Sequence, residues 1–379
     1  MIPKLFLQWE GVKLYCRCLC KPSLQLLRVA VGLVVCALIF LSGLNAEAVP
    51  EDYFIPLAIS DSPEKNIGRC GTRVPVPTSE TMALARSVSH CTSWLTSIQD
   101  EYWIQDQTYI ISIYFHVIYR SDGVGYISDD RIAEQIQVLN EDFGAIPGTL
   151  GDNGYNTHIQ FELAGITRTM NNEWFDSDDE DSYKAVLNTD PSRYLNVYTS
   201  SAGGYLGYAY FPQGSAGRWW DGIVMLHGAV GGRDNGFYQY NQGRSLVHEV
   251  GHYLGLYHTF GDYRGSCENS YSGGDLIMDT LAEGEIHFDC VQKSSCGSDD
   301  PIYNYMSYTD DLCVREFSRE QANRSVCSLV NYRPESYRVV PDVASYNEEE
   351  YWFDGSSGGG ITIDEGFVPA MLMPLLLKH

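Results

Sequence analysis

The eleven residues "HEVGHYLGLYH" constrain the fold of this chain more than any other stretch of its sequence. They run from His248 to His258 and contain three of the nine histidines in the 379-residue chain. If a helix begins near Ser245, His248 and His252 lie one turn apart on one face, where two imidazoles can bind one metal ion. The pattern therefore predicts a metal site that is built on a helix.

Gly255 explains how a third histidine can reach the same ion. An uninterrupted helix rises about 1.5 Å per residue, so His258 would lie about 15 Å beyond His248 along its axis. A glycine can adopt the left-handed conformation that ends a helix, and the chain can then turn back with His258. Three histidine ligands leave one position of a zinc ion open, which is typical of a catalytic site. Glu249, about 100° around the helix from His248, is predicted to act as the general base beside that position.

The N-terminal segment predicts export. An uncharged apolar run covers residues 29–44, follows several basic residues, and precedes a small-x-small sequence at Ala46-Glu47-Ala48. Residues 1–48 are therefore predicted to be a signal peptide, and the mature protein to be secreted without a membrane segment. The alternative is an uncleaved type II membrane anchor, for which the run is shorter than the roughly 20 residues that span a bilayer.

The charge of the chain limits its partners. The formal net charge is −24, which argues against nucleic acid because phosphate binding needs clustered lysine and arginine. Part of the negative charge lies in an acidic run at residues 175–182, which we interpret as a solvated surface loop.

The order of predicted elements indicates an α+β or α/β layered domain. Helices are predicted to begin at Ser128 and near Ser245, and a third covers residues 318–330. Strands are predicted at residues 108–119, 158–166, 194–199, 206–211 and 222–227. We expect a pro-region at residues 49–105, a catalytic domain at 106–334, and an acidic, flexible tail at 335–379.

Several segments of the chain carry a family resemblance. The extended histidine motif is the signature of metzincin zinc peptidases, which also have a methionine turn, and "NYMSY" (residues 304–308) supplies one. "GGDLIMDT" (273–280) and "NYMSYTDDLCVREFSREQANR" (304–324) resemble the secreted fungal and microbial branch of the pappalysin family, and residues 115–143 and 195–212 are similar to it too. The resemblance covers residues 108–330. The resemblance implies a twisted, mostly parallel sheet with a backing helix and an active-site helix. An irregular, disulfide-held C-terminal subdomain would follow.

The same resemblance implies a function and roles for single residues. The chain is expected to be a zinc-dependent endopeptidase acting on protein or peptide substrates. Our own candidate for the strand at the rim of the cleft, which would pair with substrate by strand addition, is residues 205–212. Met306 would form an apolar floor below the metal, and Tyr308 would assist the scissile carbonyl. Asp275 and Thr280 match a calcium-binding loop. The alternatives are another metzincin family that shares the zinc motif, or a catalytically silent zinc-binding extracellular domain.

Seven cysteines follow residue 48, an odd number that leaves at least one thiol outside intrachain disulfides. The resemblance suggests two interleaved bridges, Cys267–Cys296 and Cys290–Cys313, although sequence alone leaves other connectivities open. "RCGT" (69–72) resembles the cysteine-switch segments of some metzincin zymogens, in which a Cys70 thiolate would occupy the open zinc position. Cys91–Cys327 would then be the third bridge. The alternative is a Cys70–Cys91 bridge with a free Cys327.

Overall fold

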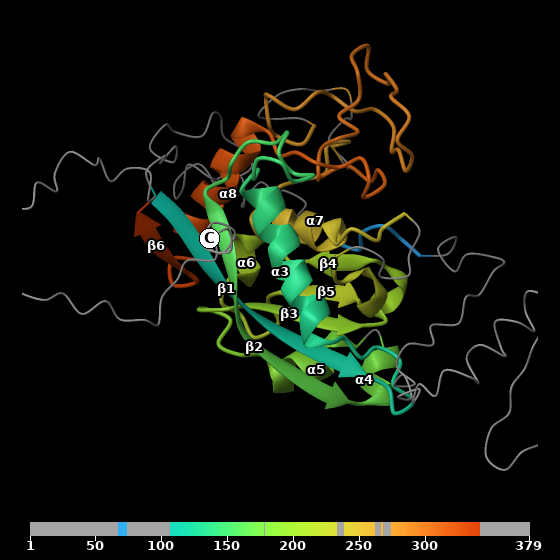
Figure 1. Ribbon diagram of the computed structural model, residues 1–379, viewed down its shortest axis with the longest axis vertical. Coiled ribbons are helices and arrows are strands. Elements are labelled where there is room, and N and C mark those ends of the chain that lie inside the picture. Colours follow the sequence, from blue (N-terminus) through green and yellow to red (C-terminus); the bar gives the residue numbers. More distant parts are fainter. Residues whose placement is uncertain are drawn as a thin grey trace, which may run out of the picture. The chain divides into compact units, whose positions relative to one another are not determined.

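A computed structural model describes residues 67–73, 107–177, 179–232, 239–261, 267 and 274–341 (Figure 1). The chain divides into two compact units, residues 1–62 and 63–379, and every described residue belongs to the second. The predicted signal peptide and nearly all of the predicted tail lie outside the described residues. Within the described ranges, no helix combines the length and the apolar character that crossing a bilayer would require.

A six-stranded sheet forms the body of the domain. Its strand order is β2-β1-β3-β5-β4, and the sixth strand, β6, pairs with β1. The pairs β1–β2, β1–β3 and β3–β5 are parallel, whereas β4 is an antiparallel edge strand beside β5. The strands are β1 (Gln107–Tyr119), β2 (Ile159–Met170), β3 (Leu195–Ser200), β4 (Gly207–Ala209), β5 (Ile223–Leu226) and β6 (Tyr337–Pro341). The predicted mostly parallel sheet is therefore confirmed.

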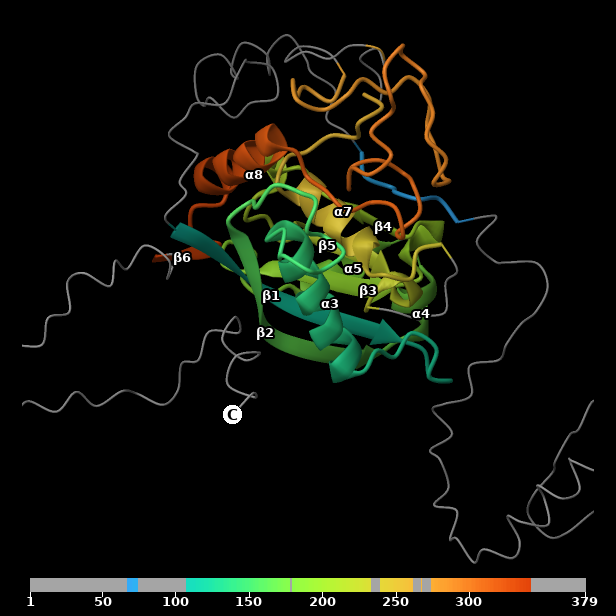
Figure 2. The ribbon, with the colours of Figure 1, turned by 45° about the horizontal axis from the view of Figure 1, so that its top comes forward.

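Two helices lie next to each other over this sheet (Figure 2). Helix α3 (Asp129–Phe143) packs on β2 and begins at Ser128, whose side chain accepts a hydrogen bond from Arg131 N. Helix α7 (Arg244–Tyr253) packs on β4 and β5, and all ten of its residues are buried. The backing helix and the active-site helix are thus both present, and α7 runs beside the edge strand β4.

The C-terminal part is irregular until α8 (Arg319–Tyr332), which begins with a capping box at Ser318. Both predicted bridges form, Cys267–Cys296 and Cys290–Cys313. Strand β6 pairs antiparallel with residues 107–111 of β1, so the domain boundary predicted after residue 334 leaves out a strand of the sheet. Strand β6 is only five residues long and mostly exposed, and it is followed by an acidic stretch, so no periodic pattern indicated that the chain returns to the sheet here.

The interpretation of residues 175–182 as a loop is also wrong in part. Helices α4 (Asn172–Asp176) and α5 (Glu180–Leu187) occupy most of this run. Acidic residues in the first turn of α5 are favourable because they face the positive end of the helix dipole. The remaining short helices are α6 (Pro212–Ser215), η4 (Ala202–Gly204) and η5 (His227–Ala229).

Candidate metal centre

The three histidines of the opening motif converge on one point. The Nε2 atoms of His248 and His252 are 3.1 Å apart, and those of His252 and His258 are 3.0 Å apart. Two nitrogens bound to one tetrahedral zinc ion at 2.0–2.1 Å would be separated by about 3.3 Å. The spacing of these donor atoms therefore fits a single tetrahedral metal ion.

Hydrogen bonds on the far side of two rings fix their protonation. His248 Nδ1 lies 2.7 Å from the carbonyl oxygen of Tyr305, and His252 Nδ1 lies 2.8 Å from that of Leu256. A carbonyl only accepts, so each Nδ1 carries the proton and each Nε2 directs its lone pair at the centre. Burial holds the pKa of His248 and His252 well below the usual range, so both rings are neutral, the form that binds metal.

Gly255 ends the helix as the motif predicts. Its φ is +90°, and α7 ends two residues earlier at Tyr253. Gly255 N donates to His252 O and Leu256 N donates to Gly251 O, both at 2.9 Å. The turn has two consequences for the metal centre, because it brings His258 back to the other ligands and presents the Leu256 carbonyl to His252.

Glu249 lies buried beside the histidine cluster. Its Oε2 accepts a hydrogen bond of 2.8 Å from the Thr72 hydroxyl, and Oε1 has no hydrogen-bond partner among the described residues. Burial raises the pKa of Glu249 to about 7, where a carboxylate is an effective general base near neutral pH.

Met306 and Tyr308 both lie next to the motif that carries the histidines, Met306 against Gly251 and Tyr308 against the His258 ring. Met306 is fully buried below α7, and a Cβ on Gly251 would collide with its Sδ. Gly251 is therefore a residue of the motif that the sequence reasoning missed: it leaves room for the methionine floor. The Tyr308 ring packs edge-on against His258 with centroids 4.8 Å apart and also contacts Phe260.

A short N-terminal segment, residues 67–73, lies along the edge that ends in β4 and contacts side chains of α7. Gly68 N donates to Gly204 O, Leu206 N donates to Gly68 O, and Gly71 N donates to Gly207 O, at 2.8–2.9 Å. The segment runs parallel to the 204–209 edge. Cys70 Sγ consequently lies 3.6 Å from His252 Nε2, and the four donor atoms of Cys70 and the three histidines all lie within 4.8 Å of one another.

Cys70 carries a free thiol, and Cys327 is disulfide-bonded. The alternative of a Cys70–Cys91 bridge with a free Cys327 is therefore wrong; Cys91 itself lies outside the described residues. Burial and the neighbouring Glu249 raise the pKa of the Cys70 thiol well above its usual value, so a thiolate here needs a cation beside it.

Two residues of the same segment make contacts that the sequence analysis did not foresee. Arg69 is 4% exposed, donates to Ser245 Oγ at 2.9 Å and lies 3.8 Å from Asp311. Thr72, besides donating to Glu249, accepts a hydrogen bond from Ala209 N at 2.8 Å. Their contacts are separated by more than 130 residues along the chain, so no local pattern predicts them. The one indication of a role for Arg69 and Thr72 in the sequence was that both lie within two residues of Cys70.

The predicted calcium residues are close together. Asp275 is buried, and its two oxygens accept hydrogen bonds from Thr280 Oγ1 at 2.8 Å and Ile277 N at 3.0 Å. Among the described residues, the one group of three or more histidine, cysteine or acidic side chains with metal-binding spacing is the Cys70–histidine cluster. Calcium at Asp275 and Thr280 is therefore not supported by the arrangement of side chains.

Comparisons with known sequences point to one family. The sequence model of the family described as pregnancy-associated plasma protein-A matches residues 178–330. An extracellular metalloprotease of Colletotrichum graminicola is 38% identical over 234 residues, which cover 59% of this chain and 77% of the relative. An extracellular metalloprotease of Pyricularia oryzae is 34% identical over 279 residues, covering 70% of this chain and 89% of the relative.

Comparison with solved structures also finds relatives, the mirolysins. Mature mirolysin of Tannerella forsythia, in complex with a cleaved peptide, is 32% identical with a TM-score of 0.52 and covers 60% of this chain and 95% of its own. A promirolysin variant is 28% identical with a TM-score of 0.54, covering 71% of this chain and 96% of its own. The pro form thus matches a larger share of this chain than the mature form does.

Proposed function

The chain belongs to the pappalysin family of metzincin zinc peptidases, and from that premise we propose how its own residues hydrolyse a peptide bond. It is a zinc metalloendopeptidase, and proteins or peptides are its substrates. The observation that carries the assignment of roles is the convergence of three histidine Nε2 atoms beside a buried glutamate.

His248, His252 and His258 would hold the zinc ion, which supplies a Lewis acid that lowers the pKa of water and polarises a peptide carbonyl. Glu249 accepts a proton from the attacking water and delivers it to the leaving amine. The Tyr308 hydroxyl donates to the carbonyl oxygen of the substrate. Its ring contact with His258 supports this role, because it places the phenol next to a ligand.

The outer edge of β4 would bind the substrate backbone by strand addition. The backbone groups now engaged by residues 67–73 are the carbonyls of Gly204 and Gly207 and the amide of Leu206. A peptide can use these groups only after that segment has left the cleft. Substrate binding and the presence of the N-terminal segment therefore exclude each other.

We further infer that residues 49–105 form a pro-region and that Cys70 is a cysteine switch. Its thiolate would occupy the zinc position that water needs. The greater coverage by the promirolysin structure supports a pro form. Two neighbouring residues would strengthen the inhibition. Arg69 anchors the segment beside Asp311, and the Thr72 hydroxyl donates a hydrogen bond to the general base, Glu249.

Replacing Cys70 tests this regulation. In the unprocessed chain, Cys70→Ala should raise hydrolysis of a quenched peptide roughly tenfold or more, because losing a contact of about 1.4 kcal/mol shifts an equilibrium tenfold. Arg73→Ala is the matched control, since Arg73 lies in the same segment and is exposed. Equal activity of the two unprocessed variants would show that Cys70 does not hold the enzyme inactive.

Secretion agrees with the relatives, which are named extracellular metalloproteases. We propose that residues 1–48 are removed as a signal peptide, rather than kept as a type II anchor. We also propose calcium at Asp275 and Thr280, from the family resemblance and the burial of Asp275. A melting temperature unaffected by calcium would contradict it.

Metal removal tests the function itself. The processed protein should cleave casein, lose this activity in a zinc chelator, and recover it when zinc is added back. A catalytically silent zinc-binding domain would cleave nothing under any of these conditions. Activity that survives complete zinc removal would contradict the assignment of the histidine cluster as the catalytic site.

A further inference from the structure

Glu283 connects the two irregular segments that complete the metal centre. Its side chain is fully buried, the Thr259 hydroxyl donates to Oε2, and the Ser307 hydroxyl donates to Oε1 at 3.4 Å. Thr259 directly follows His258, and Ser307 directly follows Met306. One carboxylate thus bridges the segment of the third histidine and the methionine turn.

His258 differs from the other two histidines because it does not lie on the helix. His248 and His252 are held by α7, whereas His258 lies beyond the Gly255 turn, in the described stretch 254–261, which forms neither helix nor strand. One backbone hydrogen bond, Thr259 N to Met306 O at 3.3 Å, joins its segment to the methionine turn. The Glu283 bridge adds side-chain hydrogen bonds to the same two segments.

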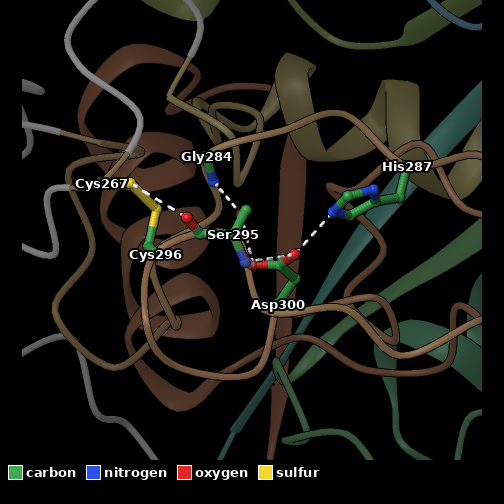
Figure 3. The surroundings of a disulfide bond; sticks show 6 residues. All are labelled: Cys267, Gly284, His287, Ser295, Cys296 and Asp300. Carbon is green, nitrogen blue, oxygen red and sulfur yellow. Dashed lines mark hydrogen bonds and ion pairs between the residues drawn. A yellow bond between two sulfur atoms is a disulfide. The ribbon is translucent and has the colours of Figure 1, made fainter.

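The loop that carries Glu283 is itself fixed (Figure 3). Gly284 N donates to Ser295 Oγ at 2.6 Å, Ser295 Oγ donates to Asp300 Oδ1 at 2.7 Å, and Asp300 Oδ2 lies 2.7 Å from His287 Nε2. Gly284 also lies against a disulfide, because a Cβ there would be 2.9 Å from Cys296 Sγ and 3.0 Å from Cys267 Sγ. The disulfide and the buried Asp300 therefore hold the backbone at Gly284, the residue next to Glu283.

We propose that Glu283 is a positioning residue of the peptidase reaction: it holds His258 in place through Thr259 and Ser307, from a loop fixed by Asp300 and the Cys267–Cys296 disulfide. The proposal rests on the proposed role of His258 as a zinc ligand. Glu283 does not touch the reacting atoms, so its effect reaches the reaction through the geometry of the third ligand.

Zinc affinity of the full-length chain, measured by competition with a chelator, tests the bridge. Glu283→Ala should raise the zinc dissociation constant about 10- to 100-fold, the usual cost of losing a residue that orients a ligand. Glu283→Gln should have a smaller effect, because one amide oxygen still accepts and the amide nitrogen can donate to the other hydroxyl. Glu285→Ala, at an exposed position two residues away, should bind zinc like the wild type.

A purely structural role would produce a different result. If Glu283→Ala lowers the melting temperature but the folded protein binds zinc normally, the proposal is wrong. The cobalt-substituted protein gives a second readout, since its absorption spectrum should change in Glu283→Ala and Thr259→Val and remain unchanged in Glu285→Ala. In the processed enzyme, kcat should fall while KM stays close to that of the wild type.

A second pair of variants tests the loop. Asp300→Asn should weaken zinc binding, because it disturbs the Ser295 and His287 contacts, whereas Asp299→Asn changes an exposed neighbour and should have no effect. Normal zinc affinity in Asp300→Asn would contradict the part of the proposal that concerns the loop. Zinc affinity is measured without turnover. The proposed role of Glu283 can therefore be refuted independently of the peptidase assignment.

Discussion

Glu249→Gln in the processed enzyme is expected to lower kcat for peptide hydrolysis by about 10²- to 10⁴-fold, the usual contribution of a general base. Glutamine has nearly the same shape and can still accept a hydrogen bond at the position of Oε2. It cannot take a proton from water. The side chain lies outside the set of converging nitrogens, so zinc stoichiometry should stay at the wild-type value.

The measurement is kcat and KM for a quenched peptide, together with metal analysis of the purified variant. Glu285→Gln provides the control, because it makes the same chemical change at an exposed position. If Glu249→Gln retains wild-type kcat with zinc bound, another group must activate water and the proposed mechanism fails. If it loses zinc as well, Glu249 has a structural role that the geometry does not indicate.

Gly255→Val is expected to weaken zinc binding roughly 10- to 100-fold without changing a ligand. Its φ of +90° is unfavourable for a β-branched residue, and a Cβ would lie 2.7 Å from Ser328 Oγ of α8. Strain of this kind costs on the order of 1–3 kcal/mol, and relieving it would move the turn. The turn positions both His258 and the Leu256 carbonyl that orients His252, so two ligands would be affected together.

Gly123→Val separates this effect from general backbone strain. Gly123 also has a φ of +90°, but nothing lies within 4 Å of the Cβ it would gain, and it is in an exposed turn. Both variants should lose stability, and only Gly255→Val should lose zinc affinity. Equal zinc affinity of the two variants would show that the glycine turn does not position the ligands.

Much of the fold could be predicted because its signals are local. Residues 107–119 are largely apolar and β-branched or aromatic, so a buried strand at β1 follows from the sequence. Ser128 and Ser318 mark helix starts for the same reason, since an N-cap acts within one turn. Strand β6 could not be found this way, because its partner Gln107–Ile111 is more than 200 residues earlier and its side chains are mostly exposed.

The metal centre likewise has one part that the sequence predicts and another that it does not. Local backbone geometry fixes the relative positions of the three histidines between His248 and His258, because helical spacing and one glycine turn act over only eleven residues. The sequence by itself therefore determined the histidine cluster, the adjacent glutamate and the turn between them. It also determined the layered fold class, through the periodicity of the strands and helices.

Only the tertiary structure decided what surrounds that cluster. Arg69 and Thr72 reach Ser245 and Glu249 from about 180 residues away, and Glu283 meets Thr259 and Ser307 across two loops. These contacts depend on how the sheet edge, the N-terminal segment and the disulfide-bonded loops come together. The physical reason is that backbone geometry carries information over a few residues, whereas the position of a side chain across a cleft is fixed by the packing of the whole domain.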